Sequence, residues 1–442
     1  MAISVALVSL GCSKNLVDGE SMLFQLQRDG YKIVQDVACA DVVIVNTCGF
    51  IEAAQNESIE TVLEIAALKK SGQLKSLIVT GCLSQMFQMQ MREEMPEVDA
   101  VLGTGSYADI SEAVRSTLKG KSYCSFNRPE ENIVPAGAGR IRTTLPHIAF
   151  LKIAEGCNNH CSYCVIPSLR GAFRSRPMED IVSEARELAA DGVKELILIA
   201  QDTTSYGMDI YGKLQLPQLL EELCAVEGIV WIRLHYCYPE KITDELLRVM
   251  AKQEKIVHYL DIPIQHCSDA ILRRMNRKGS RAYLQALFKK IRRAMPDICL
   301  RTSLIVGFPG ETQEDFSDLC GFIEEIGFDR LGAFCYSPME GTKAVAMPGQ
   351  IDEDVKNQRQ QIIMQAQSRI SLRINEGLIG KTLLVLCEEE EDGQYVGRSY
   401  KDSVDIDPKV YFTASRDIQI GSFVKVLITS CEEYDLFGSA VE

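Results

Sequence analysis

Three cysteines, Cys157, Cys161 and Cys164, lie within eight residues and follow the spacing CxxxCxxC. This spacing lets one loop hold three corners of a [4Fe–4S] cube, which normally takes four thiolates. Because the loop supplies only three, one iron keeps an exchangeable position, as in catalytic rather than structural metal centres. The alternatives are a zinc knuckle or three cysteines that only pack, but zinc spacings usually combine two CxxC or CxxH pairs.

A second set of three cysteines, Cys12, Cys48 and Cys82, is spread along the beginning of the chain. Each follows a short apolar run typical of a buried parallel strand, and segments with helical periodicity separate these runs. The apolar runs are residues 3–10, 41–46 and 77–80, and the helical segments are residues 20–28 and 58–70. The alternation predicts a doubly wound α/β domain, whose strands share one ligand-binding edge at their carboxyl ends. We expect the three thiols to converge there; the alternative is three unrelated buried thiols.

Residues 103–108 fit a loose GxGxxA pattern. This pattern alone is weak support for dinucleotide binding. Its place after a short strand and before a helix favours an ordinary fourth strand-to-helix turn of the same sheet.

The middle of the chain repeats a strand–helix unit six times. The expected strands are residues 149–153, 195–199, 230–234, 259–264, 300–306 and 331–336, and helical segments include 181–190, 244–251, 283–294 and 314–326. This repetition predicts a barrel or partial barrel with its active site at the carboxyl ends of the strands. The loop of Cys157 follows the first of these strands. His235 and His266 end two others, and a hydrogen-bonded role is favoured for them over metal ligation or proton transfer.

A long polar helix over residues 352–375 leads to short β-rich runs separated by turns. The runs are residues 381–387, 394–398, 409–413 and 423–430, which predict a small antiparallel β-barrel. Residues 377–442 contain 13 acidic and 6 basic residues, a net charge of −7. A barrel that grips RNA needs positive charge against the phosphates, so this one is expected to favour a basic protein.

Length and composition limit the class of protein and the number of domains. The chain has 442 residues, 46% hydrophobic and 24% charged, with a net charge of −14 and sixteen cysteines. In a long chain without an export signal, these cysteines indicate metal binding and buried thiols in a reducing cytoplasm. No apolar run approaches the length of a membrane span. The expected division is a domain at 1–120, a linker at 121–142, a core at 143–375 and a barrel at 377–442.

The motifs together resemble the radical S-adenosylmethionine (SAM) methylthiotransferase family. The resemblance rests on the cysteine loop 157–164, the segment CVIPSLRG at 164–171, SRP at 175–177, SLGCSKN at 9–15 and NTCGF at 46–50. The final barrel resembles the TRAM module. VGRSYKD at 396–402 is similar to the branch of the family that modifies a ribosomal protein, although residues 404–408 depart from that branch's usual pattern.

This resemblance implies two [4Fe–4S] clusters and SAM as cofactors. One cluster belongs on Cys157, Cys161 and Cys164, where the open iron chelates the amino and carboxylate groups of SAM, and the other on Cys12, Cys48 and Cys82. It also implies a partial six-unit barrel with SAM contacts at its second and fifth strand ends, near Gln201 and Gly307. Tyr163 is a candidate to pack on adenine, and packing against the barrel rim is the alternative.

Three functions remain as hypotheses. The first adds a methylthio group to the β-carbon of an aspartate in ribosomal small-subunit protein S-twelve, with a reductant and a sulfur donor as further partners. An unactivated C–H bond has no useful acidity, so this chemistry needs a radical cofactor. The second is the same chemistry on an adenosine of tRNA, which predicts a basic barrel and is disfavoured by the charge. The third is an iron–sulfur electron carrier or sensor, which needs no SAM.

Overall fold

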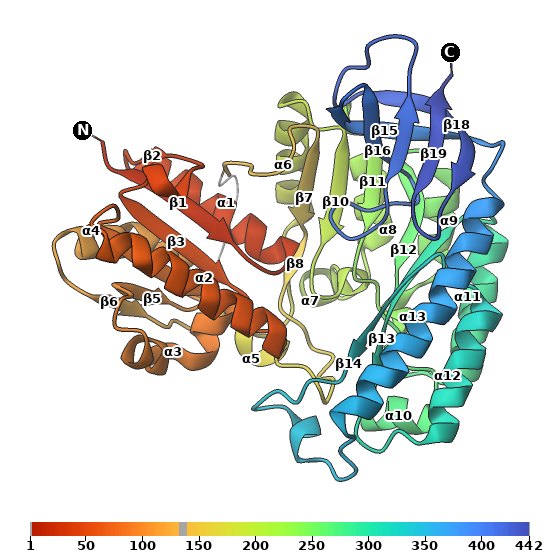
Figure 1. The fold of residues 1–442 in the computed structure, drawn as a ribbon, viewed down its shortest axis with the longest axis horizontal. Coiled ribbons are helices and arrows are strands. Elements are labelled where there is room, and N and C mark those ends of the chain that lie inside the picture. Colours follow the sequence, from red (N-terminus) through yellow and green to blue (C-terminus); the bar gives the residue numbers. More distant parts are fainter. Residues whose placement is uncertain (1, 132–138, 442) are drawn as a thin grey trace.

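The amino-terminal unit is a sheet of six parallel strands in the order β2-β1-β3-β4-β5-β6 (Figure 1). The computed structural model describes residues 2–131 and 139–441. The strands are β1 (Ser4–Ser9), β2 (Lys32–Ile33), β3 (Val42–Thr47), β4 (Ser76–Gly81), β5 (Ala100–Leu102) and β6 (Tyr123–Ser125). The helices are α1 (Ser13–Arg28), α2 (Glu52–Lys70), α3 (Cys82–Glu94) and α4 (Ile110–Leu118).

Helices cover both faces of this sheet, as predicted. Val43 and Val45 pack with α2 and α3 in one apolar cluster, whereas Val42 and Ile44 pack with α1 and α4 in another. Successive residues of a strand point to opposite faces, so a nearly continuous apolar run is what a sheet covered on both sides requires.

Two boundaries differ from the expectation. Helix α1 begins at Ser13, directly after Cys12, and not at residue 20. The sequence did not indicate this earlier start, because the first turns bury polar side chains such as Asn15 and Asp18 and therefore lack an apolar stripe. Strand β6 belongs to the first sheet, although its residues lie in the segment expected to be a linker. Residues 132–138 of that expected linker lie outside the described part of the chain.

The core is a second sheet of six parallel strands in the order β14-β13-β12-β11-β10-β7, an open partial barrel as predicted. Its strands are β7 (Ile148–Lys152), β10 (Glu195–Ile199), β11 (Trp231–Leu234), β12 (Ile256–Asp261), β13 (Cys299–Val306) and β14 (Arg330–Cys335). The larger helices are α6 (Met178–Ala190), α8 (Leu216–Cys224), α9 (Asp244–Lys252), α11 (Arg281–Ala294) and α12 (Gln313–Ile326). The short elements are β8 (Ala154–Glu155), β9 (Arg174–Ser175), α5 (Ile166–Arg170), α7 (Met208–Tyr211) and α10 (Asp269–Arg274).

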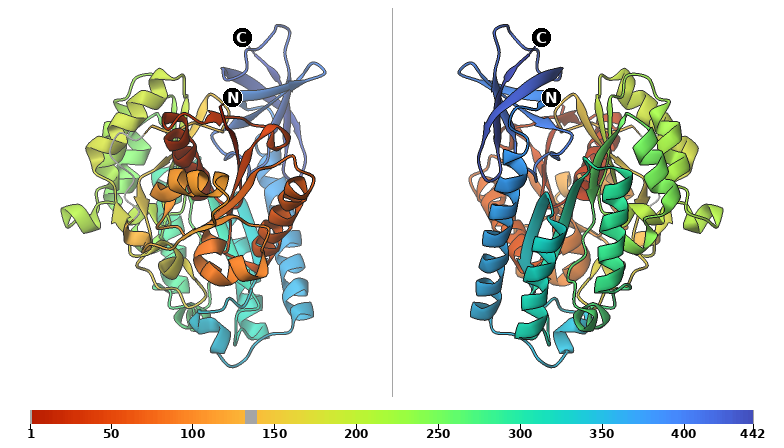
Figure 2. Two further views of the ribbon diagram at one scale, coloured as in Figure 1. Left: turned by 90° about the vertical axis from the view of Figure 1, so that its left-hand side faces the viewer. Right: turned by 90° about the vertical axis from the view of Figure 1, so that its right-hand side faces the viewer.

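The two faces of the core sheet have different partners. One face packs on the helices in the largest apolar cluster of the described residues. On the other face, Phe150 and Ile197 pack with Val17 of α1 and with Leu386 of the final barrel. The amino-terminal unit and the final barrel therefore both close the concave side of the core (Figure 2).

The carboxyl-terminal unit is a closed five-stranded barrel, connected to the core by the long helix α13 (Glu353–Glu376). Its strands are β15 (Thr382–Glu391), β16 (Gln394–Ser399), β17 (Val410–Thr413), β18 (Phe423–Cys431) and β19 (Leu436–Ala440). Strand β19 was not predicted, since Gly438 and Ser439 weaken its strand pattern. It pairs parallel to β17, whereas the other neighbouring strands are antiparallel.

The loop between β16 and β17 enters the concave side of the core. Arg330 Nη2 contacts Asp402 Oδ1 at 2.6 Å, Lys401 Nζ contacts Asp329 at 2.8 Å, and Arg233 donates to the Tyr400 carbonyl at 2.7 Å. These charged groups are buried and paired, so the loop fills the inside of the partial barrel with ion pairs rather than apolar side chains. Among residues 2–131 and 139–441, every helix is too short or too polar to traverse a lipid bilayer.

Candidate active site

The loop of Cys157, Cys161 and Cys164 lies between β8 and α5, at the carboxyl end of the first core strand. Gly156 at φ 79° and His160 at φ 50° allow it to turn sharply. The Cys157 amide donates to the Gly171 carbonyl at 3.2 Å, and the Cys164 amide donates to the Cys161 carbonyl at 3.1 Å. All three cysteines are half-buried, which suits ligands at a partly accessible centre.

Other core segments hold this loop from outside. Ser162 donates its amide to the Met275 carbonyl at 3.0 Å and its hydroxyl to the Arg274 carbonyl at 2.8 Å. Asn276 donates to the His160 carbonyl at 2.8 Å, and Asn159 donates to Asp202 at 2.8 Å. Hydrogen bonds from several core segments therefore fix the conformation of the loop.

Burial and mutual charge act on the thiols of this loop. Burial raises the pKa of Cys157 and raises the pKa of Cys164 to about 12, and the charge of Cys161 contributes to both shifts. Each cysteine thus lies within electrostatic range of its neighbours. Burial disfavours the thiolate form of these cysteines, whereas a cluster binds the thiolate, so loading with iron is expected to release protons.

The second trio lies at the carboxyl edge of the first sheet, where the sequence placed it. Cys12 precedes α1, Cys48 follows β3, and Cys82 is the first residue of α3 after β4. A Cβ atom at Gly11 would lie 2.7 Å from Cys48 Sγ, so the β1 turn passes closely over that thiol. The pKa of Cys82 is raised to about 11, chiefly by burial; the charge of Arg170 opposes this rise, and the charges of Cys12 and Cys48 add to it. Two of the three thiols sit at helix amino termini, which favour thiolates.

Both trios offer a donor set suited to an iron–sulfur cube. Within the described ranges, no group of three or more His, Cys, Asp or Glu side chains converges tightly enough to hold one metal ion. A cube binds each thiolate to a different iron, so its thiolates remain separated by the dimensions of the cluster. Three cysteines on one loop and three on one sheet edge fit such a group better than a single zinc ion.

The two trios adjoin each other across the interface between the first unit and the core. Cys82 packs with Val165 and Leu169, which directly follow the Cys164 loop. Arg170 Nε, at the end of the same short helix α5, donates to Cys82 Sγ at 3.4 Å. The chain immediately after one trio therefore touches the other.

The three residues expected to contact SAM lie around the first trio. The Tyr163 ring packs edge-on against Phe308, with ring centroids 6.4 Å apart. Gln201 Nε2 donates to Glu155, whereas its buried Oε1 atom lacks a partner among the described residues. Gly307 adopts φ 70°, and the side chain of Lys356 on α13 occupies the space that a Cβ would need.

The strand-end histidines are hydrogen-bonded, as favoured from the sequence. His235 Nε2 lies 2.7 Å from Ser403 Oγ of the barrel loop, and the Ser268 amide donates to His266 Nδ1 at 2.9 Å. Neither histidine belongs to a group that would hold a metal ion in the described part of the chain.

The glycine-rich turn at 103–108 serves to dock α5. Thr104 Oγ1 donates to the Leu169 carbonyl at 2.5 Å, and a Cβ at Gly105 would collide with the carbonyl oxygens of Asn127 and Arg128. The glycine is explained by close approach of the chain to itself, without a nucleotide phosphate.

Sequence reasoning missed two buried arginines beside the trios. Arg277 lies 3.9 Å from the centre of the Tyr238 ring, and the Tyr238 hydroxyl lies 3.4 Å from Cys161 Sγ. Arg170 contacts Cys82, as described above. The only signal for Arg170 was its position in the motif that follows the cysteine loop, and Arg277 gave no signal because it comes from a distant segment.

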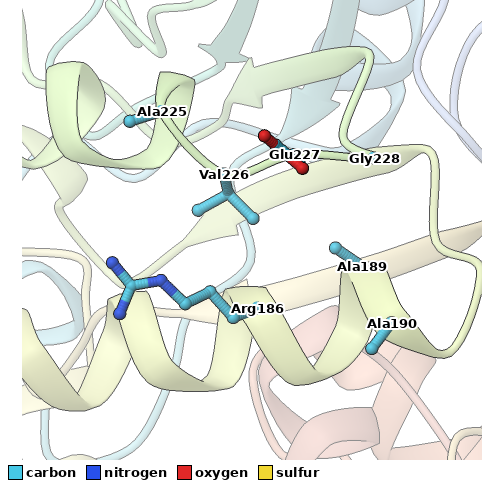
Figure 3. Close-up of a pocket in the computed structure, with 7 residues that line it drawn as sticks. All are labelled: Arg186, Ala189, Ala190, Ala225, Val226, Glu227 and Gly228. Atoms are coloured by element: carbon cyan, nitrogen blue, oxygen red, sulfur yellow. The ribbon is translucent and has the colours of Figure 1, made fainter.

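One pocket of the core lies away from the residues that the trios contact. It holds about 580 Å³ and lies between the carboxyl end of α6 and the loop that leads into β11 (Figure 3). Arg186, Val226 and Glu227 line it together with small residues. This is the amino end of the core strands, opposite the end that carries the cysteine loop.

Three families match consecutive parts of the chain. Uncharacterized protein family UPF0004 matches residues 4–103, the radical SAM superfamily matches residues 151–323, and the TRAM domain matches residues 379–441. These ranges correspond to the first five strands of the first sheet, to most of the core and to the closed barrel.

Solved structures of low sequence identity share the fold. The radical S-adenosylmethionine methyltransferase TsrM from Kitasatospora setae, with tryptophan and a SAM analogue bound, gives a TM-score of 0.58 at 13% identity over 75% of this chain and 73% of its own. The same enzyme with cobalamin and a [4Fe–4S] cluster gives 0.55 at 14% identity over 90% of this chain and 81% of its own. The cobalamin-dependent SAM radical enzyme OxsB gives 0.52 at 13% identity over 82% of this chain and 56% of its own.

Relatives of much higher identity extend over the whole chain. The ribosomal protein uS12 methylthiotransferase RimO of Clostridioides difficile is 50% identical over 440 residues, 99% of each chain. That of Pelotomaculum thermopropionicum is 50% identical over 444 residues, 100% of each chain, and that of Geobacter sulfurreducens is 48% identical over 440 residues, 99% of this chain and 98% of its own. This chain therefore belongs to the RimO family of ribosomal protein uS12 methylthiotransferases, within the radical SAM superfamily.

Proposed function

We propose that this chain is a transferase that adds a methylthio group to the β-carbon of an aspartate in ribosomal protein uS12. The observation that carries the proposal is the juxtaposition of two cysteine trios across one interface, in a chain about half identical to RimO relatives along its full length. A methylthiolation needs a centre that breaks a C–H bond and a nearby source of sulfur, and two adjoining trios suit that pairing.

Cys157, Cys161 and Cys164 would hold one [4Fe–4S] cluster, and Cys12, Cys48 and Cys82 would hold a second. When bound, the first cluster and SAM supply radical chemistry able to break an unactivated C–H bond, and the second cluster supplies the sulfur. Tyr163, Gln201 and Gly307 are proposed SAM contacts. Support comes from the buried Oε1 of Gln201, which has no partner among the described residues and is left able to accept a hydrogen bond.

The side chains around the trios position the cofactors rather than exchange protons with the substrate. Ser162 and Asn276 fix the loop, and Asp202 orients Asn159. Cys82, Val165 and Leu169 are buried together, so water is excluded from this part of the interface. A radical reaction benefits from such exclusion because side reactions of reactive intermediates with solvent are suppressed.

The acidic barrel supports a basic protein as the docking partner. Glu389, Glu390, Glu391 and Asp392 are exposed and consecutive at the β15–β16 hairpin. Ribosomal proteins carry positive charge that neutralises RNA, so complementary charge attracts uS12 and repels tRNA. A reductant and a sulfur donor complete the proposed set of partners, in the cytoplasm where ribosomes are built.

The test is an anaerobic incubation of reconstituted, reduced protein with SAM and either purified uS12 or tRNA. We expect 5′-deoxyadenosine and a uS12 peptide in which one methylthio group replaces one hydrogen at an aspartate. Thiomethylated tRNA with unmodified uS12 would favour the adenosine alternative. If no 5′-deoxyadenosine formed, the protein would instead be an electron carrier or sensor.

The number of clusters is tested by iron and sulfide analysis. A Cys12→Ala, Cys48→Ala, Cys82→Ala variant is expected to lose about half of the iron and sulfide and to retain SAM cleavage. The reciprocal variant at Cys157, Cys161 and Cys164 is expected to lose the other half together with SAM cleavage. An unchanged iron content in either variant would contradict the proposed ligand sets.

A further inference from the structure

A buried group of charged side chains lies between the two trios and joins the first unit to the core. Its members are Asp18 of α1, Lys152 of β7, Glu155 of β8 and Arg170 of α5. The side chains of Asp18, Lys152 and Arg170 are at most 5% exposed, and that of Glu155 is 13% exposed. Two positive and two negative groups balance, as burial of charge requires.

Arg170 is the centre of this group. Its Nη1 donates to Asp18 Oδ2 at 2.5 Å and to Glu155 Oε2 at 3.4 Å, and its Nη2 donates to Asn15 Oδ1. Its Nε donates to Cys82 Sγ at 3.4 Å. The planar guanidinium thus has a donor toward α1, a donor toward β8 and a third donor toward the thiol, in a fixed fork geometry.

The anchoring partners explain why Nε points at the sulfur. Lys152 contacts both Asp18 and Glu155, so the two carboxylates that flank the guanidinium are themselves held in place. Asn15 also donates to the Leu10 and Thr47 carbonyls, at 3.1 and 2.9 Å, in the turns that carry Cys12 and Cys48. The orientation of Arg170 is therefore tied to the same turns that place the second trio.

Arg170 also has a fixed relation to the first trio. It ends the five-residue helix that begins two residues after Cys164, and the Thr104 hydroxyl donates to the Leu169 carbonyl of this helix, which ties the helix to the first unit. A movement of α5 would therefore move the cysteine loop and the Cys82 contact together.

We infer that Arg170 is a positioning residue that fixes the second trio relative to the first and raises the reduction potential of the cluster on Cys12, Cys48 and Cys82. The inference rests on the proposed function, since it takes Cys82 as a cluster ligand. Reduction adds one electron, and hence one negative charge, to the cluster. A guanidinium that donates to a ligand sulfur stabilises that added charge, because hydrogen bonds to sulfur are among the determinants of cluster potential.

The test uses the full-length chain with Cys157, Cys161 and Cys164 replaced by alanine, so that only the second cluster is present. In this parent we would compare Arg170→Lys and Arg170→Gln by iron and sulfide content and by an EPR-monitored redox titration. Arg176→Lys is the matched control: Arg176 is also paired with a carboxylate, Glu184, and donates to the Lys152 carbonyl, but none of its hydrogen bonds involves a cysteine.

We expect Arg170→Gln to shift the potential to a more negative value, Arg170→Lys to shift it less, and Arg176→Lys to leave it unchanged. If the Arg170 variants instead lose the second cluster while the control keeps it, the positioning role is supported directly. Unchanged potential and iron content in Arg170→Gln, or an equal shift in the control, would overturn the inference. A parent that binds no iron would overturn the second cluster itself, and with it the proposed function of that trio.

Discussion

At the residue scale, the role of a buried polar side chain depends on the groups that it contacts, and not only on its residue type. His235 ends a core strand, yet its imidazole bonds to Ser403 of the barrel loop and lies 5.9 Å from the Tyr259 ring. A histidine at a strand end has the position of a metal ligand, but here it connects two units. Burial, and then the charges of Arg233 and Arg301, favour its neutral form by lowering its pKa.

This environment predicts a pH-dependent stability. Burial, followed by the charges of Arg233 and Arg301, lowers the pKa of His235 well below its usual value. The unfolded chain takes up a proton near the ordinary histidine pKa of about 6.5, whereas the folded chain does not. The stabilising contribution of neutral His235 is therefore complete above about pH 6.5 and is lost as the pH falls below it, by up to about 1.4 kcal/mol per pH unit.

The measurement compares wild-type protein with His235→Asn, which keeps a side chain able to bond Ser403. We expect the difference in their free energies of unfolding to decrease between about pH 6.5 and pH 5.5, with the wild type losing more. Parallel pH profiles for the two proteins would show that folding leaves the pKa of His235 unchanged and would contradict the prediction.

At the scale of elements, a turn with the sequence pattern of a nucleotide-binding loop can instead hold a neighbouring helix in place. The glycine-rich turn at 103–108 has the spacing of a phosphate-binding loop, but Thr104 bonds to the carboxyl end of α5 and Gly105 faces two carbonyl oxygens. The turn thereby fixes the short helix that separates the two trios.

Gly105→Ala is predicted to destabilise the protein by about 1–3 kcal/mol, because the added methyl must displace backbone rather than a flexible side chain. Thermal unfolding is the measurement. Gly321→Ala is the matched control: Gly321 lies within α12 with open space around its Cβ position, so alanine there is expected to stabilise by about 0.5–1 kcal/mol. An upward shift of the melting temperature of the wild type by a dinucleotide would restore the alternative reading of the turn.

At the scale of the whole molecule, the barrel is part of the core rather than an attachment. Its β16–β17 loop supplies Asp402 to Arg330, and its strand β16 supplies Arg398, which contacts Glu195 of the core at 2.6 Å. The three units therefore meet around the concave side of the core sheet, as Figure 1 and Figure 2 show.

Asp402→Ala is expected to cost about 3–5 kcal/mol of stability, because it leaves the Arg330 guanidinium buried without a carboxylate. Chemical unfolding of the full chain measures this. Asp417→Ala, at an exposed barrel position, is the control and is expected to change stability by no more than about 0.5 kcal/mol. Equal effects of the two substitutions would show that the ion pair contributes little.

The acidic hairpin predicts a salt-sensitive interaction with substrate. Glu390→Gln combined with Glu391→Gln is expected to raise KM for uS12 severalfold at low salt, to leave kcat unchanged, and to lose this effect at high salt as charges are screened. Glu222→Gln combined with Glu227→Gln removes the same charge at exposed positions outside the barrel, on α8 and in the loop that follows it. An equal rise of KM in that control would assign the effect to net charge rather than to the barrel.

The sequence by itself determined the cysteine spacings, the alternation of strands and helices, and the acidic character of the last unit. These properties are local, so they can be read from short stretches of the chain. The predicted order of the three units agrees with the fold, and the Cys157–Cys164 loop follows the first core strand as expected. Strand β19 was not predicted, because Gly438 and Ser439 weaken its local strand pattern. Its pairing with β17 joins strands that are not adjacent in sequence, and it forms only when the barrel closes.

Only the tertiary structure decided that Arg170 reaches Cys82, that Arg277 lies beside Tyr238, and that the barrel loop fills the concave side of the core. These contacts join residues far apart in the chain, and neither periodicity nor spacing carries information about them. Their physical reason is burial: a charge enclosed between packed units needs a partner, and the partner comes from whichever segment the fold places beside it.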